Sequence, residues 1–124
     1  MIFLDTHVVL WLYAEPERIP APVQLHLDAG DLVISPMVRL EISFLHEIGR
    51  VLDETTSVLG VLERDLDLRI DTDGWARAAE AAAHLSWTRD PFDRLIVSHA
   101  LVYAAPLCSR DGTIRDHYRH AFWT

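Results

Sequence analysis

Short apolar runs alternate with longer amphipathic segments along the whole chain. Residues 2–4 are apolar and are followed by an acid, and the apolar segment 8–13 comes next with no turn signal between the two. This pattern predicts a buried strand that passes directly into a helix. Further strands are predicted for the apolar runs at residues 31–34, 68–70 and 106–109.

Longer segments between these strands carry helical periodicity or helix-end signals. The predicted helices span residues 22–29, 35–48, 55–66, 72–85 and 91–104. Ser35-Pro36 is typical of a helix start, because a serine hydroxyl caps free N–H groups and proline lacks a donor that would stay unpaired there. In the last helix the side chains predicted to face inward are Leu95, Ile96, His99, Val102 and Tyr103.

The alternation of strands and helices predicts an α/β fold with a central parallel sheet covered by helices on both faces. With 124 residues, 50% of them hydrophobic, the chain is long enough for one buried core and too short for two. We therefore expect a single domain over residues 1–124.

The N-terminus and the single cysteine favour a cytoplasmic protein. No basic leader precedes the first apolar run, and every apolar run is shorter than the roughly 20 residues that cross a bilayer, so we expect neither secretion nor membrane association. Cys108 cannot form an internal disulfide, and we interpret it as a small buried hydrophobic residue.

The formal net charge of −8 has the wrong sign for a protein that holds nucleic acid by counterion release alone. Two circumstances would reconcile this charge with nucleic-acid chemistry. Bound divalent cations would neutralise a carboxylate pocket locally, and a basic protein partner would bind the remaining acidic surface.

Several acids fall where a parallel sheet would bring them together. Asp5 ends the first predicted strand, and Asp111 follows the last one by two residues. Ligands of open α/β sheets bind outside the carboxyl ends of the strands. Asp90 and Asp93 lie at the start of a helix, three residues apart and therefore on neighbouring positions of one face, and Glu41 lies at the edge of the buried face of helix 35–48.

Each acid except Asp5 also has a simple structural explanation. Asp90 before Pro91 fits a helix N-cap better than a catalytic group, Asp111 before a glycine fits a turn, and Asp93 and Glu41 fit exposed helix positions. Asp5 lies between two apolar segments and should be partly buried, which is costly for a charge without a partner or a cation. A metal ion would account for several acids converging on one place.

Carboxylates without a nearby Cys or a convincing His pair favour Mg²⁺ or Mn²⁺ over zinc. Such carboxylate-held ions activate water and stabilise the leaving oxygen in phosphodiester hydrolysis. The candidate chemistry is therefore metal-dependent cleavage of a nucleic acid.

Four motifs together resemble those of PIN-domain toxins of the VapC type. Residues 1–11, MIFLDTHVVLW, resemble the N-terminal motif of this family, residues 90–97 resemble its third acidic motif, and residues 109–111 resemble its fourth. Ser35-Pro36 followed by Glu41 matches the second acid. The resemblance covers essentially the whole chain, and the four motifs occur in order.

The resemblance implies a three-layer α/β/α sandwich and an Mg²⁺- or Mn²⁺-dependent endoribonuclease. The residues implied as catalytic groups and metal ligands are Asp5, Glu41, Asp93 and Asp111. Asp90 is a further possible ligand, and we assign the direct contact to Asp93 because it continues into the helix. Thr6 and Ser109 are implied as supporting hydroxyls.

The resemblance also implies partners. Toxins of this type are made with a cognate antitoxin that covers the active site, often through a basic side chain, and they usually form homodimers. The acidic charge of the chain fits a basic partner. Trp11 and Tyr13 are candidates for the groove that receives it, although core packing explains Trp11 equally well.

Other functions are open to a chain with several acids at strand ends, and the sequence bears on each of them. A non-catalytic interaction domain of the same fold would need none of the four acids, and a DNA nuclease would share the carboxylate chemistry. A phosphoryl-accepting receiver domain needs a lysine, and this chain has none. A phosphatase with an aspartyl nucleophile needs a second acid two residues after the first, where His7 stands.

Overall fold

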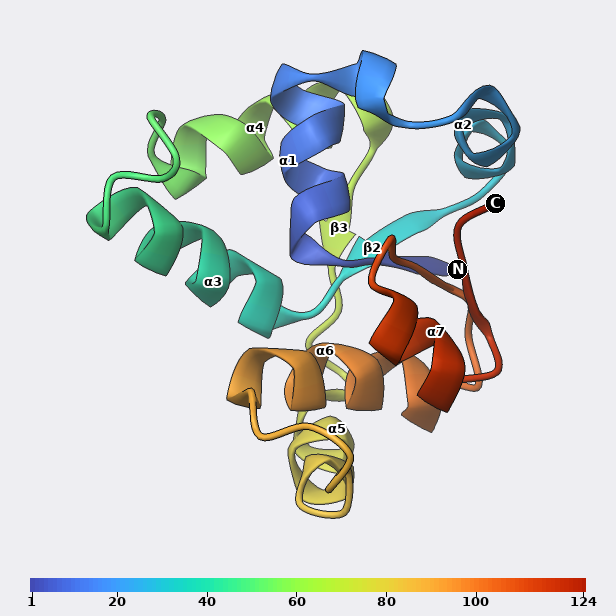
Figure 1. Ribbon diagram of the computed structural model, residues 1–124. Helices are drawn as coiled ribbons and strands as arrows, with labels where there is room; N and C mark the ends of the chain where they lie inside the picture. The colour runs from blue at the N-terminus through green and yellow to red at the C-terminus, as the bar shows by residue number, and fades with distance from the viewer.

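A computed structural model describes residues 1–124 and has a five-stranded parallel sheet at its centre, in the strand order β3-β2-β1-β4-β5 (Figure 1). The elements in chain order are β1 (Ile2–Leu4), α1 (Thr6–Ala14), the 3₁₀ turn η1 (Pro16–Arg18), α2 (Ala21–Asp28), β2 (Leu32–Ile34), α3 (Pro36–Glu47), α4 (Thr55–Leu66), β3 (Arg69–Ile70), α5 (Trp75–Ala82), α6 (Pro91–Val102), β4 (Leu107–Cys108), α7 (Gly112–His117) and β5 (Ala121–Phe122). The predicted α/β fold with a central parallel sheet is confirmed.

Helices cover both faces of the sheet and make three layers. The chain leaves β1 toward β2 and β3, and it later returns to the other side of β1 as β4 and β5. Because parallel crossovers are right-handed, the two directions of travel place their helices on opposite faces. Figure 1 shows α1, α2 and α4 on one face and α5, α6 and α7 on the other, with α3 at one end of the sheet.

The three central strands, β1, β2 and β4, are short and completely buried, whereas the edge strands β3 and β5 are partly exposed. Complete burial is expected for the inner strands of a parallel sheet with two covered faces. Phe3, Leu4, Val33, Ile34 and Leu107 are each 1% exposed or less and form the centre of the core. None of the helices has the length and apolar character needed to cross a membrane.

Four helices begin at a polar side chain that caps their first free N–H groups. Asp5 accepts a hydrogen bond from the first residue of α1, and Ser35 accepts one from Met37 N in α3. Asp90 and Asp111 cap α6 and α7 in the same way. Three of these caps, Asp5, Ser35 and Asp111, follow the carboxyl ends of β1, β2 and β4, so polar groups gather at that end of the sheet.

Helix α5 begins three residues later than predicted. The expected start at Thr72 is wrong because the Asp71 carboxylate accepts a hydrogen bond from Gly74 N at 3.0 Å and holds residues 71–74 in a turn. Gly74 is needed there, since a Cβ at this position would lie 2.6 Å from a ring carbon of Tyr103. At the other end the helix finishes at Ala82, and the next three residues continue it only with i→i+3 backbone hydrogen bonds, from the N–H groups of residues 83–85.

The sequence pattern predicts no element for residues 112–117 or for the apolar tail at 121–123. The first segment is helix α7, and the second contains β5, which pairs in parallel with β4. A six-residue helix and a two-residue strand carry too little periodicity to be recognised. The strand forms because β4 offers it hydrogen-bonding groups.

The buried face of α6 also differs in part from the prediction. Ile96 and His99 are buried as expected, whereas Leu95, Val102 and Tyr103 are only half-buried. Every residue from Ile96 to Ala100 is buried instead. Helix α6 packs against both α3 and α5, so its middle turn is covered on several sides.

Candidate active site

The candidate site lies at the carboxyl ends of β1 and β4. Asp5 follows β1 directly, and Ser109 and Asp111 follow β4. The connection from β1 leads to one side of the sheet, and β4 arrives on the other side. Such a switch point leaves a crevice outside the strand ends, which is where open α/β sheets bind their ligands.

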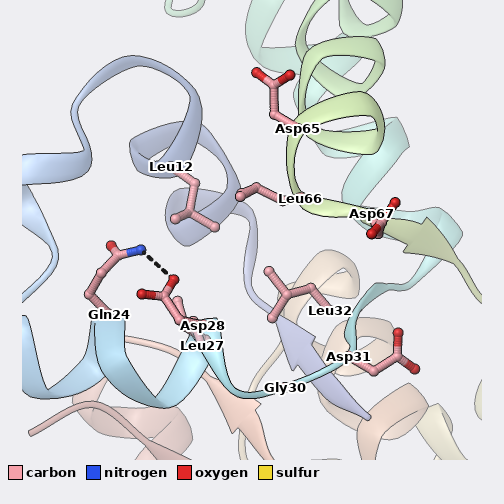
Figure 2. Close-up of a pocket in the computed structure, with 10 residues that line it drawn as sticks. All are labelled: Leu12, Gln24, Leu27, Asp28, Gly30, Asp31, Leu32, Asp65, Leu66 and Asp67. Atoms are coloured by element: carbon pink, nitrogen blue, oxygen red, sulfur yellow. Dashed lines mark hydrogen bonds between the residues drawn. The ribbon is translucent and has the colours of Figure 1, made fainter.

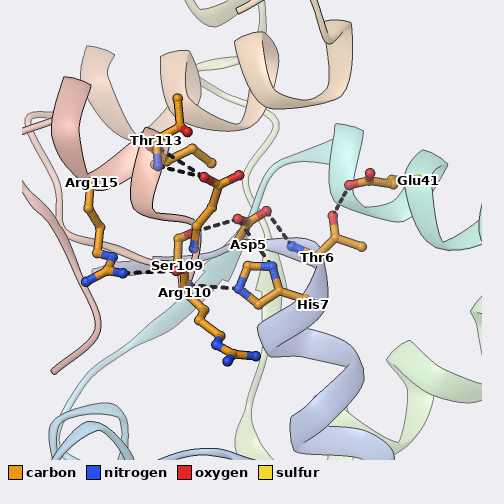
Figure 3. Close-up of polar contacts among 10 residues, drawn as sticks. Asp5, Thr6, His7, Glu41, Ser109, Arg110, Thr113 and Arg115 are labelled. Carbon is orange, nitrogen blue, oxygen red and sulfur yellow. Dashed lines mark hydrogen bonds and ion pairs between the residues drawn. The ribbon is translucent and has the colours of Figure 1, made fainter.

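Asp5 is only 5% exposed, and the surrounding polar groups hold its carboxylate in place. Its Oδ1 accepts a hydrogen bond from Thr6 N at 2.8 Å, and its Oδ2 accepts one from Ser109 Oγ at 2.6 Å. Ser109 Oγ in turn accepts a hydrogen bond from Asp111 N at 3.1 Å (Figure 3). The buried hydroxyl of Ser109 therefore links the two acids at the ends of neighbouring strands.

Glu41 and Asp93 reach the site from helices. The Thr6 hydroxyl donates a hydrogen bond to Glu41 Oε1 and so ties α3 to the start of α1. Asp93 lies in the first turn of α6. The four acids predicted as ligands thus come from four segments that are well separated along the chain.

All four acids line one pocket of about 160 Å³. Its lining consists of Asp5, Thr6, His7, Leu10, Glu41, Leu45, Asp93 and Asp111. No arginine belongs to this lining, so no side-chain cation in the pocket wall neutralises the carboxylates.

The acids of the pocket repel one another and are partly shielded from water. Burial is the largest cause that raises the pKa of Asp93 to about 7, and the neighbouring carboxylates of Asp90, Asp5, Asp111 and Glu41 raise it further. The pKa of Glu41 is also raised, first by burial, against an opposing effect of the Thr6 hydrogen bond. A group of acids that resists ionisation is a site where a cation would be stabilised.

The raised pKa of Asp93 makes the stability of the protein depend on pH when no metal is present. Between the ordinary value of 3.8 and about 7 the folded state binds more protons than the unfolded chain, so the free energy of unfolding falls as pH rises through this window. Because Asp93 is only half-buried, we expect the free energy of unfolding to fall by about 1–2 kcal/mol, which is less than the whole pKa shift would give. Urea denaturation with a chelator, at about pH 5 and about pH 8, measures this loss.

The Asp93→Asn variant should lack this part of the pH dependence and should be more stable than the wild type at the higher pH. Asp116→Asn, which changes an exposed acid of α7, is the matched control and should follow the wild type. An Asp93→Asn variant with the same pH dependence as the wild type would contradict the assigned repulsion.

Asp90 lies outside the lining of the pocket. Its Oδ1 accepts a hydrogen bond from Phe92 N at 2.8 Å, and its side chain is exposed. The structure therefore gives Asp90 the N-cap role that its sequence context favours, and its charge reaches the pocket only through its effects on Asp93 and Glu41.

His7 is a pocket residue that the sequence reasoning did not select. Its Nε2 accepts a hydrogen bond from Arg110 N at 2.9 Å, and its Nδ1 lies 3.5 Å from Asp5 Oδ2 (Figure 3). Burial is the largest cause that lowers the pKa of His7, although Asp5 and Asp111 oppose it. The available signal was its position two residues after Asp5, which places it in the first turn of α1.

A second polar cluster, also missed from the sequence, lies deeper in the core. The His99 ring connects Ser35 Oγ, 3.1 Å from its Nδ1, with Asp71 Oδ2, 2.8 Å from its Nε2. Burial alone would raise the pKa of Asp71, but the hydrogen bonds from His99, Tyr103 and Gly74 lower it below its usual value. We refer to these groups as the Asp71–His99 network.

The Asp71–His99 network has the Ser-His-Asp composition of a hydrolase triad but no access for a substrate. Ser35 is 1% exposed and His99 is completely buried. Ser35 Oγ also accepts the capping hydrogen bond of α3. The network is therefore structural: it joins α6, the turn before α5 and the start of the helix that carries Glu41.

Cys108 is a buried side chain, as predicted, and is not a nucleophile. It is completely buried in β4. Burial, with a smaller effect of Asp5, raises the pKa of its thiol to about 12. The thiol therefore stays protonated at neutral pH, and thiolate chemistry is unfavourable there.

A larger hollow, of about 470 Å³, lies away from the candidate site, at the amino ends of β2 and β3. Four acids line it: Asp28, Asp31, Asp65 and Asp67. Figure 2 shows these carboxylates spread around the rim rather than converging, and two of them already accept hydrogen bonds from Gln24 and Arg69. The smaller pocket of the four acids is the candidate site because its carboxylates converge and are partly buried.

The pocket of the four acids fits a hard divalent cation in the chemistry of its donors. Carboxylates and hydroxyls supply only oxygen, which suits Mg²⁺ or Mn²⁺. No three His, Cys, Asp or Glu side chains are already placed to hold one ion directly. Mg²⁺ usually keeps several waters and binds proteins through one or two carboxylates, so an arrangement with water between ion and acids remains compatible with these residues.

Comparison with known proteins gives matches in both sequence and structure. Residues 2–119 match a family model described as PIN domain. Ribonuclease VapC22 of Mycobacterium tuberculosis is 30% identical to this chain in an alignment of 123 positions that covers 96% of this chain and 92% of that protein.

Two solved structures share the fold. One is VapBC2 from Rickettsia felis bound to a DNA fragment from their promoter, with a TM-score of 0.68, 18% identity and full coverage of both chains. The other is FitAcB from Neisseria gonorrhoeae, with a TM-score of 0.54, 20% identity and coverage of 100% of this chain and 97% of that one. At these identities the likeness is one of fold, and it confirms the three-layer α/β/α sandwich.

Proposed function

This chain belongs to the PIN-domain family, and on that basis we propose that it is a metal-dependent endoribonuclease, the VapC-type toxin of a toxin–antitoxin pair. The observation that carries the proposal is the pocket at the β1/β4 switch point. Asp5, Glu41, Asp93 and Asp111 line it together, and no arginine in its wall offsets their charge. The ribonuclease name of the 30% identical relative supports RNA as the substrate.

The proposed ligands of Mg²⁺ or Mn²⁺ are these four acids, held at the positions described above. When bound, such ions activate water and stabilise the charge that develops on the phosphate and the leaving oxygen. Thr6 and Ser109 orient two of the carboxylates, because their hydroxyls donate to Glu41 and Asp5. Asp90 begins the helix that carries Asp93 and contributes charge from outside the pocket.

The residues around the acids define what they do before any metal binds. Both oxygens of Asp5 accept hydrogen bonds, so its orientation is preset. Asp93, with a pKa of about 7, is the acid that most readily holds a proton in the metal-free pocket. Leu10 and Leu45 add apolar surface to the wall, which strengthens electrostatic interactions inside the pocket.

We further propose that the protein is cytoplasmic, forms a homodimer and binds a cognate antitoxin. The similar folds come from structures named VapBC2 and FitAcB. A net charge of −8 favours a partner with a basic segment, and a basic side chain would find four acids in the pocket.

The test is incubation of purified, partner-free protein with mixed-sequence single-stranded RNA, with Mg²⁺, with Mn²⁺ or with a chelator. We expect cleavage with either metal and none with the chelator. Glu41→Gln keeps an acceptor for the Thr6 hydroxyl but removes the charge, and it should lower the rate by at least about 100-fold. Glu47→Gln, an exposed acid on the same helix, should behave as the wild type.

Other results would change the assignment. Intact RNA in every reaction, with protein shown to be folded, would favour the non-catalytic interaction domain. Cleavage that persists in the chelator would exclude the metal site. A parallel reaction on single-stranded DNA distinguishes a ribonuclease from a DNA nuclease.

A further inference from the structure

Three aromatic rings gather directly beside the pocket of the four acids. The centroid of the Trp11 ring lies 5.0 Å from that of His7 and 5.8 Å from that of Trp123. His7 and Trp123 are 6.5 Å apart in an edge-on arrangement. Trp11 comes from α1 and Trp123 from the C-terminal residues after β5, so the fold brings together rings that are far apart in the sequence.

Two guanidinium groups lie over the Trp11 ring. The Cζ atom of Arg18 is 4.3 Å from its centroid, and that of Arg110 is 5.8 Å away. Arg18 also pairs with Glu15, whereas Arg110 makes no ion pair with any carboxylate. In a chain with a charge of −8, Arg110 is thus a cation without an anionic partner at the edge of the site.

A pocket of about 270 Å³ opens between these groups. Its lining consists of His7, Trp11, Arg110 and Asp111. His7 and Asp111 also line the pocket of the four acids, so the two pockets share a wall. The two pockets therefore adjoin each other at His7 and Asp111.

Hydrogen bonds hold this wall in place. Figure 3 shows the His7 ring between the Asp5 carboxylate and the backbone of Arg110, whose N–H donates to His7 Nε2. The carbonyl of Arg110 accepts a hydrogen bond from Arg115 at 3.1 Å. The backbone beneath the Arg110 side chain is therefore fixed from both sides, which lowers the entropic cost of binding against it.

We propose that His7, Trp11 and Arg110 form a subsite that stacks one unpaired base of the RNA next to the phosphate that is cleaved. This inference rests on the proposed ribonuclease function. Aromatic rings and guanidinium planes stack on bases regardless of sequence, and only a base outside a duplex has a free face for them. The shared wall places such a base one step along the strand from the four acids.

The subsite makes single-stranded segments the preferred substrate. A stacked base contributes about a 10- to 100-fold increase in affinity by this kind of contact. An RNA with one abasic position beside the cleavage point should lose that factor, and a fully paired RNA should bind weakly. The neutral stacking surface and the free Arg110 together also offset the repulsion between the acidic chain and RNA.

The test uses the full chain and a labelled single-stranded RNA, with binding measured by fluorescence anisotropy in chelator so that no cleavage is needed. Arg110→Gln changes an exposed side chain and leaves the core intact. We expect it to weaken binding about 10-fold and, in metal-containing reactions, to raise KM with little change in kcat. Arg39→Gln, an exposed arginine on α3 without an ion pair, is the matched control.

Trp11→Leu removes the stacking surface and should weaken binding about 10- to 100-fold. Because Trp11 also packs against the core, this variant is first checked for folding by circular dichroism. The affinity of the wild type should fall by the same factor when the RNA carries an abasic position. Trp11→Leu should bind the intact RNA and the abasic RNA equally well.

The outcomes separate the two proposals. If the wild type cleaves RNA, and both Arg110→Gln and folded Trp11→Leu bind RNA as tightly as the wild type does, the subsite is overturned and the ribonuclease function stands. Base-dependent binding of RNA without any cleavage supports the subsite and overturns the ribonuclease. No binding of single-stranded RNA by the wild type overturns the subsite.

Discussion

Replacing Asp5 with Asn is expected to lower the rate of RNA cleavage by about 100- to 1,000-fold while the protein stays folded. Asp5 is the most buried of the four acids, and it lies where the strand order reverses. Asparagine caps helices as well as aspartate does, so the start of α1 should be preserved. What is lost is the negative charge, together with one of the two acceptors that now bind Thr6 N and Ser109 Oγ.

Single-turnover cleavage of the same RNA, with saturating Mg²⁺ or Mn²⁺, measures this effect. Asp65→Asn is the matched control, because Asp65 is an exposed acid that lines the larger hollow. It should cleave at the wild-type rate. If Asp65→Asn were the damaging change and Asp5→Asn harmless, the active site would have to be assigned to the larger hollow.

Replacing His99 with Leu is expected to lower the free energy of unfolding by about 3 kcal/mol. The change leaves the Asp71 carboxylate, which is 4% exposed, without one of the two side chains that now hydrogen-bond to it at 2.8 Å. It also removes one of the two hydrogen-bond partners of Ser35 Oγ at the start of α3. Breaking one side of a buried pair is costly because the remaining charge stays buried.

Urea denaturation monitored by tryptophan fluorescence measures the loss. Tyr103→Phe is the comparison, since it removes only one of the three hydrogen bonds to Asp71 and should cost about 1 kcal/mol. Equal losses for the two variants would show that His99 contributes no more than a single hydrogen bond. Because Ser35 begins the helix that carries Glu41, the His99→Leu variant is also expected to cleave RNA more slowly.

Two of the four acids of the candidate site were placed there by the sequence pattern because their positions follow from local rules. An acid directly after an apolar run marks the carboxyl end of a strand, and parallel strands share that edge of the sheet. Asp5 and Asp111 were found in this way, whereas Glu41 and Asp93 were assigned through the resemblance of their motifs to those of VapC-type PIN domains. Asp90 was also given its N-cap position correctly from Pro91 and the helix that follows.

Other features depend on contacts between distant residues and were decided by the tertiary structure. Ser109 Oγ binds a carboxylate 104 residues away, and no periodicity marks such a pair. Asp71 resembles any acid in a turn until the fold places it against His99 and Tyr103. Burial then makes an unpaired charge costly, and the network follows from that cost.

The same division applies to the surface around the site. The sequence by itself determined the α/β class, the parallel sheet and the acids at the strand ends, because apolar periodicity and helix capping act over a few residues. Only the tertiary structure decided that residues 121–122 form β5 and that Trp123 after them lies beside Trp11. A two-residue strand has almost no preference of its own, so pairing with β4 and burial of neighbouring rings determine where it lies.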